Sequence, residues 1–430
     1  MLMKIDRKAV PEFKPIGNIK IREAEKTWLD NGIPVYSINA GFQDIIKIEL
    51  IFFNDGFDPI QPLAVSAANR MLGEGTSKHN AQQLAELIDH SGAYYETEES
   101  ADYCSVVLFT LNKYLDNTLP VIREILTDAA FPESELSTFR QNNRQRLTVE
   151  NEKVSSVSRK KFNEVLFGSV HPYGYYTRSD DYTKLSRESL LACYQKNYHS
   201  GNCHILVAGK VNGEAITTLN RVFGKEDWKK NTSSPKQEIS IQSDKIKKHQ
   251  VEKKEAIQSS IRIGKVLFNK THPDYIGMTI LNTALGGYFG SRLMNNIRED
   301  KGYTYSIGSA VVSLKQAGYF FISTEAGTDV TMKTIDEIYK EVERLGNEPV
   351  GNDELQMVKN FMIGNFLKGI DGAFHLSDRW KGLLLYGLEY DYYYRYLDTI
   401  QHIQPEQLQS LANKYLNTSD FYEVVAGKKE

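Results

Sequence analysis

Arg298 and Tyr305 are the two side chains whose types and spacing suggest chemistry. They lie seven residues apart in a glycine-rich segment that begins at Leu285. A guanidinium and a phenol hydroxyl both donate hydrogen bonds without changing protonation, so together they could hold a peptide carbonyl and stabilise negative charge that develops on it. An arginine in the last turn of a helix and a tyrosine at the start of a strand also occur for purely structural reasons.

The residues around this pair predict a turn, a short helix and a strand. Ser291 is a favourable N-cap for the helix, and Gly302 suits the left-handed conformation that often ends one. From Tyr305 the sequence Tyr-Ser-Ile-Gly-Ser-Ala-Val-Val has a β-like pattern, so Arg298 should lie near a helix end and Tyr305 at a strand start. No Gly-Lys-Ser/Thr follows the glycines, so we expect no nucleotide site. The turn glycines are Gly286, Gly287 and Gly290, and the apolar helix face is Leu293, Met294 and Ile297.

This segment resembles the second-half signature of the pitrilysin/insulinase family of inverse-zincin metallopeptidases. The matching pattern is Leu-Gly-Gly-x-x-x-Ser-Arg-Leu-x-x-x-Ile-Arg-Glu-x-x-Gly-x-x-Tyr. In that family an arginine and a tyrosine seven positions later bind the substrate backbone. The resemblance implies this role for Arg298 and Tyr305. It also implies an α+β fold of two similar halves, which form one side of a clam-shell chamber.

Composition predicts a globular protein with more than one packed domain. The chain has 430 residues, of which 41% are hydrophobic, enough to bury substantial cores. The 52 lysines and arginines nearly balance 55 aspartates and glutamates, so we expect no broad basic surface for nucleic acid or an anionic membrane. The cysteines lack CxxC spacing, which argues against a disulfide framework or a cysteine zinc site. They are Cys104, Cys193 and Cys203.

The start of the chain and its hydropathy predict a cellular location. Residues 1–15 carry charges where a signal peptide needs an apolar core, and nowhere do about twenty apolar residues run together. We therefore predict a cytoplasmic protein without a membrane partner, provided that no longer precursor is trimmed before this numbering begins.

The order of apolar and polar residues predicts strands and helices throughout the first half. In 45–53 apolar residues alternate with Lys47 and Glu49, which predicts a half-buried strand with one polar face. The expected strands are 33–37, 45–53, 103–111 and 203–209, and the expected helices are 63–72, 81–91, 115–129, 133–166 and 188–198.

Landmarks in the first half recur in the second half. Ala208-Gly-Lys210 recurs as Ala426-Gly-Lys428, and Glu135-Leu136 recurs as Glu354-Leu355, at offsets of 218 and 219 residues. Nearly equal offsets indicate a duplicated α+β unit of roughly 210 residues. The composition between the halves is polar and charged, which predicts a linker. The predicted boundaries are 1–228 for the first half, 229–255 for the linker and 256–430 for the second half.

The chain departs from the family at the position of its zinc motif. Inverse zincins carry His-x-x-Glu-His on a first-half helix, shortly before a Gly-Thr; the histidines bind zinc and the glutamate polarises the attacking water. Here Gly75-Thr76 is present, and the motif falls on Ser66-Ala67-Ala68-Asn69-Arg70. Ser66 and Arg70 thus replace the ligands, and Asn69 replaces the base. The fixed positive charge of Arg70 would repel a zinc ion.

The family's third ligand also lacks a clear counterpart. That ligand is a glutamate upstream of a His-Pro-x-Gly, and it would fall near Gln145 or Arg146, before His171-Pro-Tyr-Gly174. Glu150 is close enough that a small gap could restore it. The nearest pair of histidines, His199 and His204, spans a predicted helix-to-strand junction, so we expect no substitute metal site and no cofactor in this chain.

Three hypotheses about function follow. In the first, the chain is the zinc-less subunit of a heterodimeric, processing-peptidase-like enzyme, and it supplies Arg298 and Tyr305 to a peptide or unfolded polypeptide at the zinc of a homologous partner; a homodimer is the other assembly considered. In the second, it is a non-catalytic structural or scaffold homologue, and the pair is a relic. In the third, it is a peptidase through an unrecognised metal site. We favour the first, because only the substrate-binding part of the family's chemistry is retained.

Overall fold

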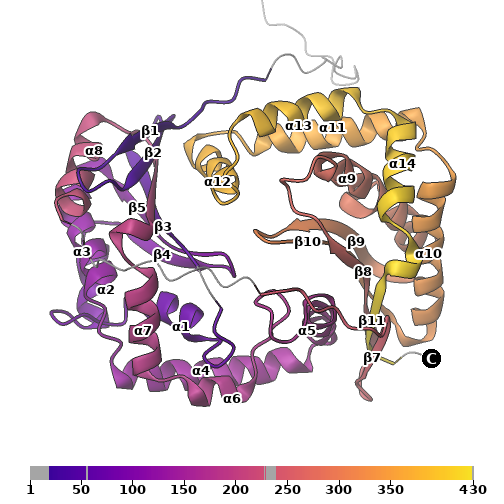
Figure 1. Cartoon of the computed structure of the whole chain (residues 1–430), viewed down its shortest axis with the longest axis horizontal. Coiled ribbons are helices and arrows are strands. Elements are labelled where there is room, and N and C mark those ends of the chain that lie inside the picture. Colours follow the sequence, from indigo (N-terminus) through magenta and orange to yellow (C-terminus); the bar gives the residue numbers. More distant parts are fainter. Residues whose placement is uncertain (1–18, 55–56, 227, 229–238, 429–430) are drawn as a thin grey trace, which may run out of the picture.

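Two β-sheets organise the chain, and helices cover their outer sides (Figure 1). The computed structural model describes residues 19–54, 57–226, 228 and 239–428. The strand order is β1-β2-β6-β3-β5-β4 in the first sheet and β7-β11-β8-β10-β9 in the second. The strands are β1 (Glu25–Trp28), β2 (Pro34–Asn39), β3 (Ile45–Phe53), β4 (Tyr94–Glu99), β5 (Tyr103–Leu111), β6 (Cys203–Gly209), β7 (Lys248–Glu252), β8 (Gln258–Leu267), β9 (Thr304–Ser313), β10 (Gly318–Gly327) and β11 (Tyr422–Gly427).

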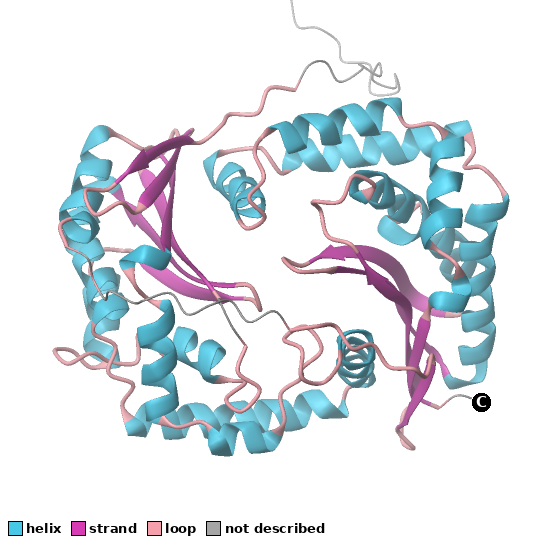
Figure 2. Cartoon of the chain, in the orientation of Figure 1, coloured by secondary structure: helices cyan, strands magenta, loops and turns pink. Residues whose placement is uncertain are grey.

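Helices make up most of the remaining described residues (Figure 2). Two π-helical segments contribute to the glycine-rich segment: η4 (Thr283–Gly287) overlaps its start, and η5 (Met294–Asp300) lies within it. The α-helices are α1 (Ala64–Arg70), α2 (Ala81–Asp89), α3 (Leu115–Thr127), α4 (Glu133–Glu152), α5 (Val154–Phe167), α6 (Ser179–Lys184), α7 (Arg187–Asn197), α8 (Gly213–Leu219), α9 (Tyr275–Asn282), α10 (Thr331–Asn347), α11 (Asn352–Lys368), α12 (Ala373–Leu384), α13 (Asp391–His402) and α14 (Pro405–Tyr415). None of the helices in this described part is long and apolar enough to cross a membrane.

The two sheets repeat one topology, which confirms the predicted duplicated α+β fold. Strand β6 pairs parallel with β2 and antiparallel with β3, and β11 pairs in the same way with β7 and β8. Gly209 and Gly427 end the two equivalent strands with the same φ of 127°, a conformation that favours glycine. Helices α4 and α11 carry the repeated Glu-Leu pair in their first turn, and its leucines, Leu136 and Leu355, are buried.

The two halves exchange a helix. Helix α5 of the first half packs on β8 and β11 of the second sheet, where Phe162 and Leu166 share an apolar cluster with Tyr422 and Val424. Conversely, α12 of the second half packs on β2 and β6 of the first sheet. Figure 1 shows α12 beside the first sheet and α5 beside the second. Each sheet therefore buries one face only with the help of the other half.

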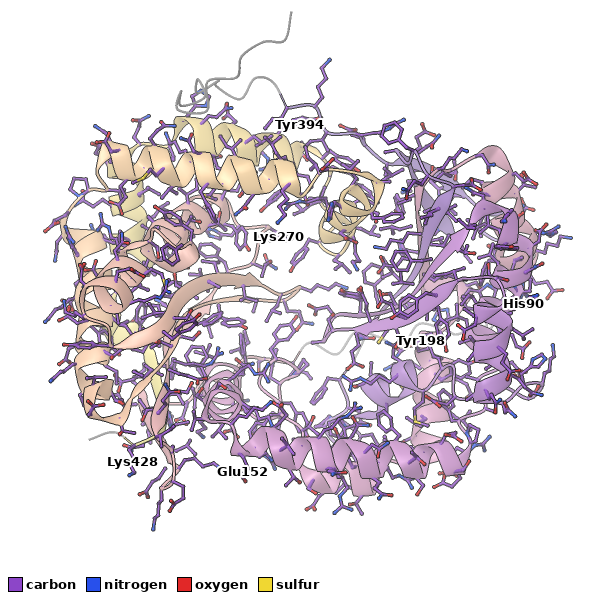
Figure 3. All side chains as sticks on the ribbon, turned by 180° about the vertical axis from the view of Figure 1, so that it is seen from behind. His90, Glu152, Tyr198, Lys270, Tyr394 and Lys428 are labelled. Carbon is purple, nitrogen blue, oxygen red and sulfur yellow. The ribbon has the colours of Figure 1, made fainter. Side chains whose placement is uncertain are left out.

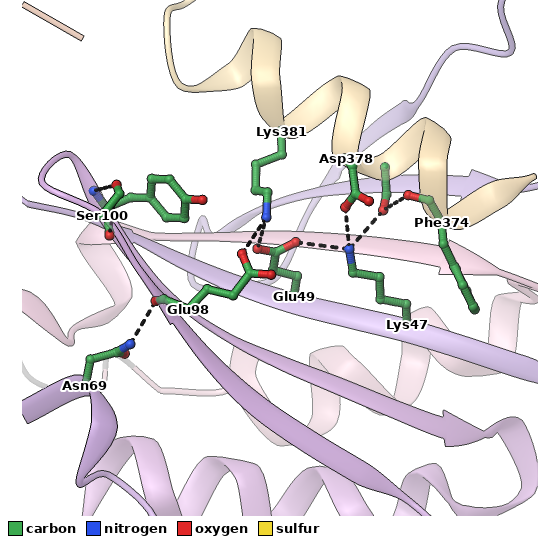
Figure 4. A network of polar contacts seen from close by, with 10 residues as sticks. Lys47, Glu49, Asn69, Glu98, Ser100, Phe374, Asp378 and Lys381 are labelled. Atoms are coloured by element: carbon green, nitrogen blue, oxygen red, sulfur yellow. Dashed lines mark hydrogen bonds and ion pairs between the residues drawn. The ribbon is translucent and has the colours of Figure 1, made fainter. Parts of the chain in front are cut away.

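Helix α12 also explains why one sequence prediction was wrong. Lys47 and Glu49 do not form a solvent-exposed strand face: they are 5% and 0% exposed, because α12 covers them. Lys381 Nζ of α12 donates to Glu49 Oε1 at 2.9 Å and to Glu98 Oε2 at 2.8 Å (Figure 4). Lys47 Nζ donates to Asp378 Oδ1 at 2.6 Å and lies 3.5 Å from Glu49 Oε2. We call these five residues the inter-half ion network.

Two element boundaries also differ from the predictions. The expected helix at 133–166 is divided between α4 and α5 at Lys153, whose ψ of 121° is extended. This break lets α5 turn toward the second sheet. Residues 229–238 of the predicted linker lie outside the described residues, and its later part forms β7. The polar composition of β7 resembles a linker because β7 is an edge strand, with alternate side chains exposed.

Candidate functional site

Arg298 and Tyr305 lie together, on either side of the predicted turn. Helix η5 ends at Asp300, and the Gly302 amide donates to Arg298 O at 3.1 Å while Gly302 has φ of 65°. Strand β9 begins two residues later. The Arg298 Cζ atom lies 5.5 Å from the centroid of the Tyr305 ring. The structure therefore brings together the two side chains that the sequence singled out.

Phe289 is a third member of this site, and sequence reasoning missed it. The Arg298 Cζ atom lies 4.8 Å from the centroid of its ring, so the guanidinium contacts two aromatic rings. Phe289 and Tyr305 are 63% and 86% exposed. The sequence feature that could have identified Phe289 is a large aromatic side chain within a glycine-rich turn. Such contacts stabilise a partly exposed arginine by about 0.5–1 kcal/mol and orient its planar fork.

The backbone beneath these exposed side chains is held rigidly. Arg292 forms a bidentate ion pair with Glu354 of α11, with Nε–Oε1 at 2.8 Å and Nη2–Oε2 at 2.9 Å. The apolar face of η5 is buried as predicted, since Leu293 and Ile297 are both 0% exposed. A side chain at Gly286 would place its Cβ 2.5 Å from Ser309 Oγ, so this close approach to β9 requires glycine.

The predicted N-cap role of Ser291 is wrong. Its backbone carbonyl accepts from the Asn295 amide at 2.9 Å, but its buried hydroxyl makes no hydrogen bond with the part of the chain that the structure describes. Packing of the helix face and the Arg292–Glu354 pair hold the helix start instead of a side-chain cap.

The three degenerate zinc-motif positions lie on α1 and form hydrogen bonds with β4 and with Tyr198, the residue that follows α7. Ser66 Oγ and Arg70 Nη2 both donate to Glu99 Oε1, at 2.8 and 2.5 Å. Asn69 is 0% exposed; its Nδ2 donates to Glu98 O at 2.8 Å (Figure 4), and its Oδ1 accepts from the Tyr198 hydroxyl at 2.7 Å. Burial raises the pKa of Tyr198 well above its usual range, so the hydroxyl stays a donor. Figure 3 places Tyr198 inside the first half.

These residues do not fit zinc. They offer a hydroxyl, an amide whose nitrogen and oxygen are both hydrogen-bonded and a fixed positive charge, whereas zinc needs neutral imidazole, thiolate or carboxylate ligands. Across the described ranges, no group of three or more His, Cys, Asp and Glu side chains could hold a metal ion. A cavity of about 560 Å³ lined by Ser66, Arg70 and Glu99 remains at this position.

The candidate third-ligand residues lie elsewhere. Gln145, Arg146 and Glu150 of α4 line a separate cavity, which none of the zinc-motif positions lines. Glu150 Oε1 accepts from Lys153 Nζ at 2.5 Å, and this hydrogen bond lowers the pKa of the carboxyl group. The structure therefore does not bring Glu150 to Ser66 and Arg70.

We predict that the purified protein holds no stoichiometric zinc, because Arg70 and Asn69 leave no ligand set at the family position. Elemental analysis after dialysis against a chelator measures this directly, with a histidine-ligated zinc peptidase dialysed in parallel as the control. About one zinc per protein molecule that survives the dialysis would contradict the prediction.

Comparisons with known proteins place two consecutive parts of the chain in one family. The model "Insulinase (Peptidase family M16)" matches residues 67–172, and the model "Peptidase M16 inactive domain" matches residues 184–362. The "Uncharacterized zinc protease YmxG" of Bacillus subtilis (strain 168) is 24% identical over 321 residues, which cover 74% of this chain and 77% of that protein. The "Non-peptidase homolog YmxG" of Helicobacter pylori (strain ATCC 700392 / 26695) is 21% identical over 370 residues, which cover 84% of each protein.

Solved structures share the fold over nearly the whole chain. The peptidase M16 inactive domain from Pseudomonas fluorescens superimposes with a TM-score of 0.82 at 20% identity, covering 94% of this chain and 98% of that one. A protease from Helicobacter pylori superimposes with a TM-score of 0.84 at 16% identity, covering 94% and 100%. These likenesses show the shared fold. The two consecutive family matches, over residues 67–172 and 184–362, show that the chain belongs to the insulinase family of metallopeptidases, peptidase family M16.

Proposed function

We propose that this chain is the zinc-less subunit of a two-chain M16 peptidase. In this proposal it presents Arg298 and Tyr305 to a peptide held at the zinc of a homologous partner. One contrast carries the proposal. Arg298 and Tyr305 lie together at the surface, on a turn that is held by buried contacts. Ser66 and Arg70, in contrast, donate hydrogen bonds to Glu99, and neither side chain can serve as a zinc ligand.

The chemistry expected of the pair is binding and charge stabilisation. The guanidinium of Arg298 carries several N–H donors in one plane, so it can hold two neighbouring backbone carbonyls. The carbonyl oxygen of the cleaved bond gains negative charge as water adds, and the Tyr305 hydroxyl can donate to it without losing its proton. Phe289 extends the same surface and can pack against a side chain of the peptide.

A scaffold role is the second candidate, and one contact favours it. Arg298 Nη1 lies 3.1 Å from Glu299 Oε1, so the arginine already has an ion-pair partner within its own turn. In that case Arg298 and Tyr305 would contribute only to local stability.

Mixing with a zinc-bearing homologue tests the proposal. The pair should hydrolyse an unstructured peptide, and each protein alone should be much less active. Equal activity of the homologue with and without this protein would refute the proposed role.

We also predict a stable assembly with that homologue, since the proposed site is incomplete within one polypeptide. Light scattering of each protein alone and of the mixture should show a complex with the mass of the two proteins together. An unrelated protein of similar mass serves as the control for nonspecific association. A strict monomer in the mixture would remove the basis for action at a partner's zinc.

A further inference from the structure

Another cavity with a polar wall lies in the second half, among α9, η4, β9, α11, α12 and α13. Its volume is about 360 Å³, near the lower end of the roughly 300–1,000 Å³ that small-ligand sites occupy. Gly287 and Phe361 line it, and the Phe361 ring packs against Tyr288 at 5.0 Å, so the cavity borders the glycine-rich turn of the Arg298 site. Its polar wall includes Thr279, Asn282, Thr283, Asn365 and Arg379.

Arg379 is the one charged residue among those that line the cavity. Its Nε donates to Gly369 O at 3.2 Å, and its Cζ lies 5.1 Å from the Phe366 ring centroid and 5.8 Å from that of Tyr393. These contacts fix the plane of the guanidinium. Within the described residues, no carboxylate forms an ion pair with either Nη atom. Arg379 is thus an oriented positive charge without a carboxylate to neutralise it.

Asn282 supplies an unused acceptor in the same wall. The residue is 9% exposed, and its Nδ2 donates to Ser309 O at 3.2 Å. Its Oδ1 is buried and accepts no hydrogen bond from the described residues. A buried amide oxygen without a donor costs about 1–3 kcal/mol, so a ligand that brings an N–H group to it would be favoured.

A neighbouring lysine, Lys270, adds a second positive charge near Arg379. Burial lowers the pKa of Lys270 to about 8, and repulsion by Arg379 contributes to the same shift. Lys270 Nζ donates to Gly382 O at 3.1 Å, and its side chain lies among the second-half elements (Figure 3). An anion bound at Arg379 would therefore relieve repulsion between two cations.

We propose that this cavity binds the carboxylate of a peptide. The two Nη groups of Arg379 would hold the carboxylate oxygens in a bidentate pair, and Asn282 Oδ1 would accept from a nearby peptide N–H. An acidic residue and a free peptide C-terminus both present this chemistry. Because this binding needs neither zinc nor a partner, it can be tested separately from the proposed peptidase role.

The position of the cavity suits a peptide that also reaches the Arg298 site. Ser309 lines the cavity on β9, four residues beyond Tyr305. At about 3.3 Å per residue these positions are roughly 13 Å apart, so an extended peptide would span them with about four residues. A peptide that occupies both the cavity and the Arg298 site would need a carboxylate about four residues from the part that contacts Arg298. The protein would therefore prefer peptides with a carboxylate at that distance.

The test measures binding of three matched octapeptides to the isolated, intact protein by calorimetry. One ends in glutamate amide, one in glutamine amide and one in glutamine with a free carboxylate. We expect at least one carboxylate peptide to bind about tenfold more tightly than the glutamine amide, the usual scale for one charge-assisted pair. If the glutamate amide peptide binds more tightly, the cavity recognises the carboxylate of an acidic residue. If the glutamine peptide with a free carboxylate binds more tightly, the cavity recognises a peptide C-terminus.

Substitutions in the cavity wall separate this site from general charge attraction. Arg379→Gln should remove the preference for a carboxylate peptide without changing the affinity for the glutamine amide peptide. Asn365→Asp, at an exposed lining position, keeps Arg379 but adds a carboxylate and should have the same effect. Arg395→Gln, at a 62% exposed arginine paired with Asp391, should retain the preference. Equal affinity for all three peptides, including no binding of any, or a preference that survives Arg379→Gln and Asn365→Asp, would overturn the proposal.

Discussion

Replacing Tyr305 by phenylalanine is expected to lower the turnover of the reconstituted pair by roughly 10²-fold, the usual scale for losing one donor to a developing oxyanion. Because Tyr305 is 86% exposed and only its hydroxyl is removed, folding and assembly should not change. Arg298→Ala should raise KM as well as lower kcat, since the fork binds the substrate before and during the reaction. Steady-state kinetics of the pair with each variant measure both effects.

Tyr303→Phe is the matched control, because it removes a neighbouring phenol hydroxyl whose ring packs against the core. This variant should keep the rate of the wild-type pair. Melting temperature and complex mass are measured for each variant, so that a lost rate can be separated from lost structure. Unchanged kinetic constants in well-assembled Tyr305→Phe and Arg298→Ala pairs would favour the scaffold hypothesis instead.

Replacing Lys381 by methionine is expected to lower the free energy of unfolding by about 3–5 kcal/mol. Glu49 is 0% exposed, and without Lys381 its nearest cation is Lys47 at 3.5 Å. Burial by itself would lower the pKa of Lys381, but the attraction of Glu49 and the hydrogen bonds to Glu98 and Glu49 outweigh it and raise that pKa. The lysine is therefore charged at neutral pH, and removing it leaves a buried carboxylate poorly compensated.

Urea denaturation measures this loss. Lys340→Met is the control, because Lys340 is 66% exposed and its partner Glu337 keeps a second cation, Lys301, so this pair should contribute less than about 1 kcal/mol. Adding Glu49→Gln to Lys381→Met should recover part of the loss, since the orphaned charge is then removed. If Lys381→Met costs no more than Lys340→Met, the inter-half ion network does not stabilise the fold in this way.

The duplicated fold and the Arg298–Tyr305 turn could be predicted because local signals specify them. The alternation in 45–53 identifies β3, and Gly302 marks the helix end that places Arg298 and Tyr305 on either side of one turn. The repeated Ala-Gly-Lys landmark coincides with two strands of equivalent topology. In each case the residues that carry the information are close in sequence to the feature that they specify.

Features that depend on distant contacts could not be predicted. Alternation shows that the two faces of β3 differ, but not that α12, more than 300 residues later, buries Lys47 and Glu49. Phe289 was overlooked because its contact with Arg298 depends on how η5 turns back. Asn282 and Arg379 looked like ordinary helix residues, since their shared cavity exists only after five helical segments and one strand have packed together.

The exchange of α5 and α12 links the duplication of this protein to self-association. A solitary copy of the repeat would leave one sheet face uncovered, and it could cover that face only with a helix from a second copy. The ancestral unit would in that sense be a domain-swapped dimer. Joining two copies in one polypeptide converts this bimolecular encounter into an intramolecular one, with an effective concentration near the millimolar range. Once the two copies are fused, their sequences can diverge, because neither copy has to bind a second copy of the same sequence.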